Sequence, residues 1–61
     1  MKAKDIKIGI RYKSGRTVQE VTVIDRITEK SITFRTKRVF PDEYDGNFFQ
    51  RKSLNTEIEL A

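Results

Sequence analysis

Residues 17–36, TVQEVTVIDRITEKSITFRT, hold two runs rich in β-branched residues, separated by a polar break at residues 28–30. Val, Ile, Thr and Phe fit a pleated, half-buried surface because their stiff side chains lose little entropy there. Neither glycine nor proline, which weaken strands, interrupts the stretch. It therefore predicts the two central strands of a small sheet, one over Thr17–Asp25 and one that begins at Ile32, joined by a tight turn at Thr28–Ser31.

Alternation within these two strands predicts which side chains face the core, because successive residues of a strand point to opposite faces. In the later strand the inward residues are expected to be Ile32, Phe34 and Thr36. The outward residues are expected to be Thr33, Arg35 and Lys37. In the earlier strand Val21 and Val23 share one face, and Val18 and Ile24 share the other. The alternation breaks at Val23-Ile24, which indicates a β-bulge, and Ile27 is expected to cover the core beyond it.

The later strand is expected to become irregular near Lys37-Arg38, because Arg38 would otherwise continue the inward set. Pro41 should end it, since proline lacks the backbone N–H that a sheet needs. The acidic segment Pro41–Asn47 reads as a loop.

Three further strands are expected at the two ends of the chain. Four apolar residues alternate with Lys7, Gly9, Arg11 and Lys13 over Ile6–Lys13, and a turn containing Gly15 follows. Gly9 is expected to mark either a bend or the place where the regular strand begins. After the acidic loop we expect a short strand at Phe48–Arg51, with one Phe in the core and the other partly exposed. A single 3₁₀ turn over Lys52–Thr56, pinned by Leu54, then leads into a short edge strand at Glu57–Leu60.

These elements predict an all-β fold, namely a small five-stranded SH3-like barrel with a single 3₁₀ turn near the C-terminus. The 61 residues form one domain, residues 1–61. A chain of this size buries only about 60% of the surface that its unfolded form exposes, so we expect marginal stability.

The segment Ile6–Val18, IKIGIRYKSGRTV, two valine-rich strands and a closing S-L-x-x-x-I-x-L at Ser53–Leu60 resemble the short SH3-like barrel proteins of tailed bacteriophages and other mobile elements. They also resemble the KOW-type barrels of transcription and translation factors. The loop at Pro41–Asn47 departs from both groups. The resemblance therefore implies the fold and a role near nucleic acid or a polymerase, but it implies no particular binding surface.

The composition lacks the residues on which most catalysis depends. There is no Cys and no His, so the usual general base, the usual nucleophile–base pairs and a structural zinc site are missing. The only clustered carboxylates are Asp42, Glu43 and Asp45, whose spacing does not match a calcium loop. We expect a non-enzymatic protein with no cofactor and no metal, although a weak Mg²⁺ or Ca²⁺ contact at that loop stays open.

The chain should be soluble and cytoplasmic. No apolar run approaches the roughly 20 residues that cross a bilayer, and the first residues lack the apolar stretch of a signal peptide. The absence of Cys agrees with a reducing compartment.

The charge is positive and unevenly distributed. Thirteen Lys and Arg against nine Asp and Glu give +4, and leaving out residues 41–47 with their three acids gives thirteen against six, or +7. Such a balance favours a polyanionic partner, DNA or RNA, or a protein that processes nucleic acid. The predicted nucleic-acid face consists of Arg35, Lys37 and Arg38, helped by Arg11, Lys13 and Arg51. For any one of these cations, a plain role in keeping strand edges soluble is the competing interpretation.

A protein-binding role is the alternative hypothesis. Aromatic residues near arginine are common in interface hot spots, and Tyr12, Phe40 and Tyr44 could line an apolar patch between the first and the long loop. The carboxylates Asp42, Glu43 and Asp45 could then recognise a basic protein surface. In that case a phage-type protein would dock on a host protein and inhibit or redirect it.

Overall fold

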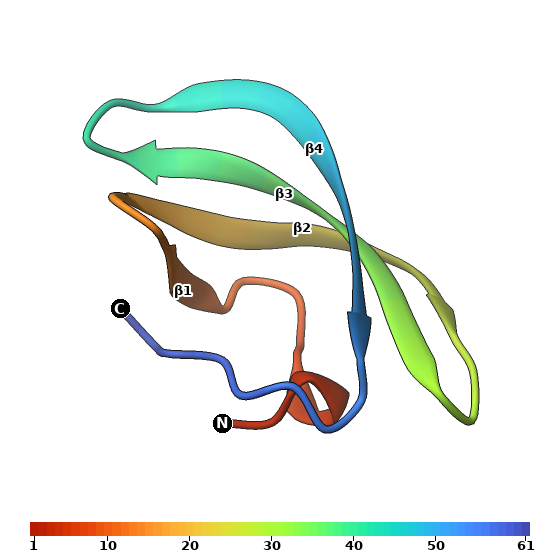
Figure 1. Ribbon diagram of the computed structural model, residues 1–61. Helices are drawn as coiled ribbons and strands as arrows, with labels where there is room; N and C mark the ends of the chain where they lie inside the picture. Colours follow the sequence, from red (N-terminus) through yellow and green to blue (C-terminus); the bar gives the residue numbers. More distant parts are fainter.

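The computed structural model describes residues 1–61 as one antiparallel sheet with the strand order β1-β2-β3-β4 (Figure 1). The elements in chain order are η1 (Ala3–Asp5), β1 (Arg11–Ser14), β2 (Thr17–Ile27), β3 (Ser31–Phe40) and β4 (Tyr44–Ser53). The all-β prediction is confirmed. No helix in the structure has the length and the apolar character needed to cross a bilayer.

β2 and β3 form the centre of the sheet, as the stretch 17–36 predicts. Ile32, Phe34 and Thr36 are fully buried, which confirms the predicted inward face of β3. The register of β2 against β3 shifts between Val21 and Val23, so a bulge lies close to the predicted place. The bulge reverses the alternation, which leaves Val21 buried and Val23 exposed. The prediction that these two valines share a face is therefore wrong.

The core lies on the concave side of the sheet and consists of Ala3, Ile6, Tyr12, Val21, Ile32, Phe34 and Ile58. The rings of Tyr12 and Phe34 meet edge to face, with centroids 6.2 Å apart. One buried polar pair borders this core: the Thr36 hydroxyl donates a hydrogen bond to Gln19 Oε1 over 3.1 Å. Buried polar groups are tolerated when they are paired in this way.

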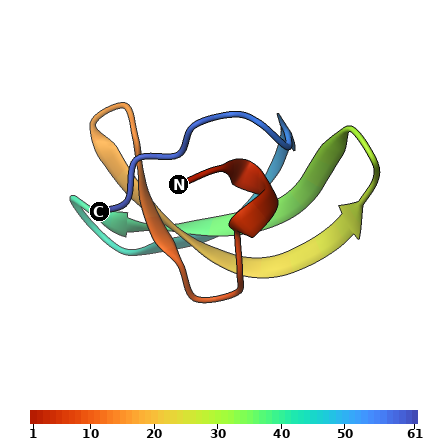
Figure 2. The same ribbon diagram turned by 90° about the horizontal axis from the view of Figure 1, so that it is seen from below.

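The two terminal segments cross the concave side next to each other (Figure 2). The Ala3 N–H donates to the Thr56 carbonyl over 2.8 Å, and the Ile58 N–H donates to the Met1 carbonyl over 2.7 Å. Farther along, the last segment reaches the free edge of β1, where the Lys13 N–H donates to the Glu59 carbonyl over 2.7 Å. Glu57–Leu60 makes isolated bridges, Lys2 with Glu57 and Tyr12 with Leu60, and does not extend the four-stranded sheet as a continuous strand.

Two further predictions, those for the 3₁₀ turn and for Ile27, are wrong. The 3₁₀ helix is η1, close to the N-terminus, whereas Lys52 and Ser53 belong to β4 and Leu54-Asn55 form a simple turn. The first strand begins at Arg11, because Gly9 adopts a φ of 94° and the chain turns there, which agrees with the bend expected at Gly9. This turn leaves Ile8 exposed. Ile27 is also exposed and does not cover the core.

β3 ends at Phe40, immediately before Pro41 as predicted, but β4 begins earlier than predicted, at Tyr44. The loop is therefore shorter than predicted and spans residues 41–43. The register of β3 against β4 shifts between Thr36 and Arg38, which confirms the irregularity expected there. Extra residues of β4 absorb this shift, among them Asn47 with a φ of 53°. Phe48 is half-buried and Phe49 is exposed, so neither ring belongs to the core.

Candidate functional site

The face of the sheet opposite the core carries three rows of side chains across the strands. Thr33, Arg35 and Lys37 mark these rows, because they alternate with the buried residues of β3 and therefore point outward. Residues paired with them share their face. The first row is Arg26, Thr33 and Arg51; the second is Val23, Arg35 and Phe49; the third is Arg11, Glu20 and Lys37.

Five of the six cations predicted for nucleic-acid binding already have carboxylate partners. On the second row, Arg35 Nε lies 3.1 Å from Asp25 Oδ2. The other four ion pairs join Arg11 to Glu20 (2.8 Å), Lys13 to Glu59 (3.7 Å), Lys37 to Glu43 (3.3 Å) and Arg38 to Asp42 (3.1 Å). Arg51 forms no ion pair.

Together with Glu43, the third row has no net charge, because two cations face two carboxylates. Hydrogen bonding from Arg11 lowers the pKa of Glu20, and the nearby Lys37 ammonium lowers it further. In return, the hydrogen bond to Glu43 and the charge of Glu20 raise the pKa of Lys37. These groups hold one another in their charged forms, so this end of the outer face presents little net positive charge to a ligand.

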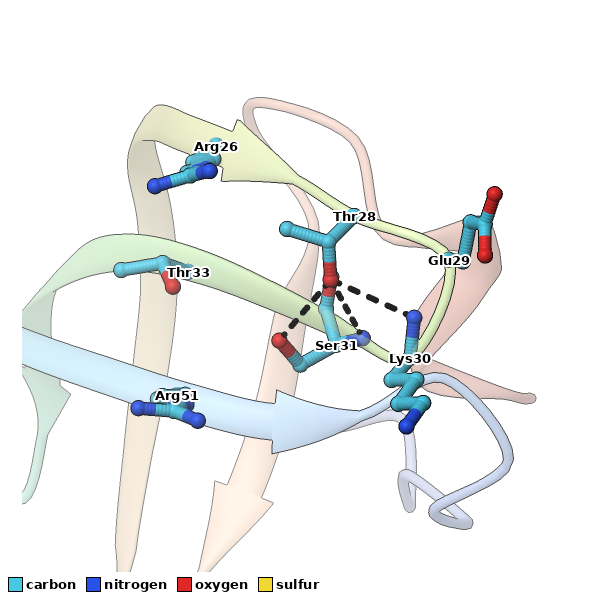
Figure 3. Close-up of a pocket in the computed structure, with 7 residues that line it drawn as sticks. All are labelled: Arg26, Thr28, Glu29, Lys30, Ser31, Thr33 and Arg51. Atoms are coloured by element: carbon cyan, nitrogen blue, oxygen red, sulfur yellow. Dashed lines mark hydrogen bonds between the residues drawn. The ribbon is translucent and has the colours of Figure 1, made fainter.

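The opposite end of the outer face carries unpaired positive charge. A hollow of about 530 Å³ opens beside the β2–β3 turn; we call it the basic hollow, and it is lined by Arg26, Thr28, Glu29, Lys30, Ser31, Thr33 and Arg51 (Figure 3). Three cations and one carboxylate line it, a net charge of +2. None of Arg26, Lys30 and Arg51 forms an ion pair. Glu29 projects from the turn away from the two arginines (Figure 3).

Thr28 holds the turn that shapes the basic hollow. Its Oγ1 accepts hydrogen bonds from the backbone N–H of Lys30 over 3.2 Å and from that of Ser31 over 3.0 Å. Its own N–H donates to the Ser31 carbonyl over 2.8 Å. Threonine is suited to such a turn because its hydroxyl can satisfy nearby backbone groups. These contacts fix the backbone of Lys30 close to the end of β4, where the Leu54 N–H donates to the Lys30 carbonyl.

An exposed aromatic ring lies in the row next to the one that contributes Arg26, Thr33 and Arg51 to the basic hollow. Phe49 lies in the second row with 64% of its surface exposed, and Arg51 follows two residues later on the same face of β4. Val23, at the other end of this row, is also exposed. The outer face thus combines unpaired cations with an apolar platform.

The aromatic residues of the alternative hypothesis do not form one surface. Tyr12 lies in the core with 3% of its surface exposed. Phe40 is 58% exposed and Tyr44 is about half exposed, both near the β3–β4 turn that carries Asp42 and Glu43. There the Tyr44 ring meets Phe48 edge to face at 5.8 Å, and the Arg38 guanidinium lies over it at 5.3 Å.

Two residues of the basic hollow, Arg26 and Lys30, are absent from the predicted site. The bulge in β2 puts Arg26 opposite Thr33, and alternation alone does not place a residue beyond a bulge. Lys30 was read only as part of a polar turn. The signal that could identify both residues is their distance in sequence from the carboxylates at residues 41–47. Only two carboxylates, Asp25 and Glu29, lie close to Arg26 and Lys30 in sequence.

Comparisons with known proteins give no family. The sequence matches no protein-family model and no curated protein, and the fold matches no solved structure.

Proposed function

We propose that the protein is a non-enzymatic module that binds nucleic acid through its phosphate backbone, with the basic hollow as the principal contact. The observation that supports this most directly is that Arg26, Lys30 and Arg51 all line one hollow and that none of them has a carboxylate partner. Arginine presents a planar fork of donors that matches a phosphate group.

The energetics favour unpaired cations over paired ones. A cation that neutralises a phosphate releases a condensed counterion, and this release supplies most sequence-independent affinity. A cation in an ion pair must first give up its carboxylate, and surface pairs are worth only about 0–1 kcal/mol. Arg35, Lys37, Arg38, Arg11 and Lys13 can therefore add to binding, but we assign them secondary roles.

The proposal also includes the fold expected from the sequence. We propose that the open sheet is the major part of an SH3-like barrel in which Glu57–Leu60 acts as the fifth strand. In support, this segment exchanges backbone hydrogen bonds with β1: Lys13 N–H to Glu59 over 2.7 Å and Ala61 N–H to Arg11 over 3.2 Å. Such closure would leave the outer face, with its three rows, open to a ligand.

Two double variants test the site. Arg26→Gln with Arg51→Gln removes two unpaired charges, whereas Arg11→Gln with Arg35→Gln removes two paired charges from the same face. Fluorescence anisotropy with labelled DNA and RNA oligonucleotides, across a range of salt concentrations, measures both affinity and its salt dependence. We expect the first variant to reduce the slope of log affinity against log salt by roughly 1.4–1.8, and the second to reduce it less. Equal losses in both variants, or no binding by the parent protein at low salt, would contradict the proposal.

Protein binding is the second candidate, favoured by the exposed rings of Phe40 and Tyr44 beside the carboxylates Asp42 and Glu43. The partner would present a basic surface. A pull-down from lysate, with and without nuclease, separates the two functions. A protein that is captured at high salt after nuclease treatment, and that is lost in Phe40→Ala with Tyr44→Ala, would favour this candidate.

A further inference from the structure

The ring of Phe49 is exposed and does not belong to the hydrophobic core. It points away from the core, and 64% of its surface is open to solvent. In the second row, Phe49 lies next to Arg35 on β3, and Val23 on β2 lies on the other side of Arg35. Arg35 is fixed by Asp25, with Nε 3.1 Å from Oδ2. The ring therefore stands on an ordered part of a sheet and not on a loose loop.

The spacing between this ring and the basic hollow suits a nucleotide chain. Arg51 follows Phe49 on the same face of β4, so the two rows lie roughly 7 Å apart along the strand. Arg26 and Arg51 flank Thr33 and are separated by two strand spacings, roughly 10 Å. A base over Phe49 would thus place its neighbouring phosphate at the mouth of the basic hollow. Aromatic rings beside a basic groove are the usual means of binding single strands without sequence preference.

Resting on the proposed function and extending it, we propose that the ligand is single-stranded nucleic acid, held by a base stacked on Phe49 and a phosphate between Arg26 and Arg51. A duplex does not use this mode without unpairing, because its bases are stacked on each other and would have to be flipped out. A duplex would contact only the cations, and its affinity would not depend on the Phe49 ring.

Affinity measurements test the stacking. Phe49→Ala is compared with Phe40→Ala, which removes an almost equally exposed ring, 58% against 64%, at the other end of the sheet. We expect Phe49→Ala to weaken binding of a single-stranded oligonucleotide roughly ten-fold to a hundred-fold, while the salt slope stays unchanged. Binding of the matching duplex should stay within two-fold or so of the parent value, and Phe40→Ala should bind both ligands like the parent.

A fluorescent reporter gives a second, direct reading. The chain contains no Trp, so Phe49→Trp and Phe40→Trp each introduce a single indole. A stacked base should quench the indole at position 49 and leave the indole at position 40 unchanged. If the parent binds duplex as tightly as single strand and Phe49→Ala binds like the parent, the stacking proposal is wrong while the phosphate-binding function stands. If the parent binds neither ligand at low salt, the function itself is wrong.

Discussion

Tyr12 couples the stability of the core to pH. Burial raises the pKa of its phenol above the ordinary 10.0, although the neighbouring Thr36 hydroxyl acts in the opposite direction. The folded state therefore holds the proton more tightly than the unfolded state does. The resulting stability is complete below pH 10 or so, and it is lost as the pH rises through the pKa of the folded state.

We expect the free energy of unfolding to fall as the pH is raised above about 10, and Tyr12→Phe to reduce this fall. Urea denaturation followed by circular dichroism at neutral and alkaline pH measures it. Tyr44→Phe, which changes an exposed ring, is the control. Part of the loss of stability at alkaline pH should remain in Tyr12→Phe, because the pKa of Lys37 is raised as well. An unchanged alkaline fall in Tyr12→Phe would show that the core phenol does not contribute.

The sequence predicts single residues well where alternation is regular. Ile32, Phe34 and Thr36 are buried as expected, since nothing interrupts the period of two in β3. The prediction fails for Ile8 and Val23, where a glycine turn and a bulge reverse the faces. Ion pairs are harder still to predict, because they depend on the strand register. The register decides, for example, that Glu20 lies between Arg11 and Lys37.

The β2–β3 turn depends on one hydroxyl. Thr28→Val keeps the shape of the side chain but removes the acceptor for the N–H groups of Lys30 and Ser31. We expect a loss of about 1 kcal/mol in the free energy of unfolding, measured by urea denaturation, because both groups can still bond to water. The affinity for nucleic acid should fall as well, since Lys30 loses its fixed position. Ser14→Ala, at the exposed end of β1, serves as the control.

The segment Glu57–Leu60 is held in place by one buried side chain. Ile58 packs in the core, whereas Leu60, two residues later, is exposed. We expect Ile58→Ala to cost about 2–4 kcal/mol and Leu60→Ala less than about 1 kcal/mol, again by urea denaturation. Equal costs would mean that the segment is anchored by its backbone hydrogen bonds and not by Ile58.

At the level of elements, the sequence indicates the β2–β3 pair and its turn, but it misjudges where β4 begins. Asp45, Gly46 and Asn47 favour turns, so they predict a loop. Pairing with β3 overrides this preference and places Tyr44 opposite Arg38. Gly46 has a role within the strand, because a Cβ there would lie 2.9 Å from the Phe48 ring. Local propensity cannot reveal a contact of this kind.

The molecule as a whole separates its charges between the two ends of an elongated body of 34 × 20 × 16 Å. The carboxylates of the β3–β4 turn neutralise Lys37 and Arg38, while the basic hollow is left uncompensated. Replacing Asp42 and Asp45 by Asn and Glu43 by Gln should raise the affinity for any polyanion and steepen its salt dependence. Anisotropy titrations measure this effect. The free energy of unfolding should change by no more than about 1 kcal/mol, because these carboxylates are exposed. A weaker affinity with folding intact would instead identify this turn as a recognition element.

The position of the two terminal segments governs when the chain can fold. Ala3, Ile6 and Ile58 belong to the same core on the concave side of the sheet, so the core joins segments that are far apart in the sequence. Proteins dominated by such distant contacts fold slowly, typically in milliseconds to seconds, because loop closure must precede the gain from burial. We therefore expect the chain to stay open to chaperones and proteases until the segment around Ile58 has docked on the core.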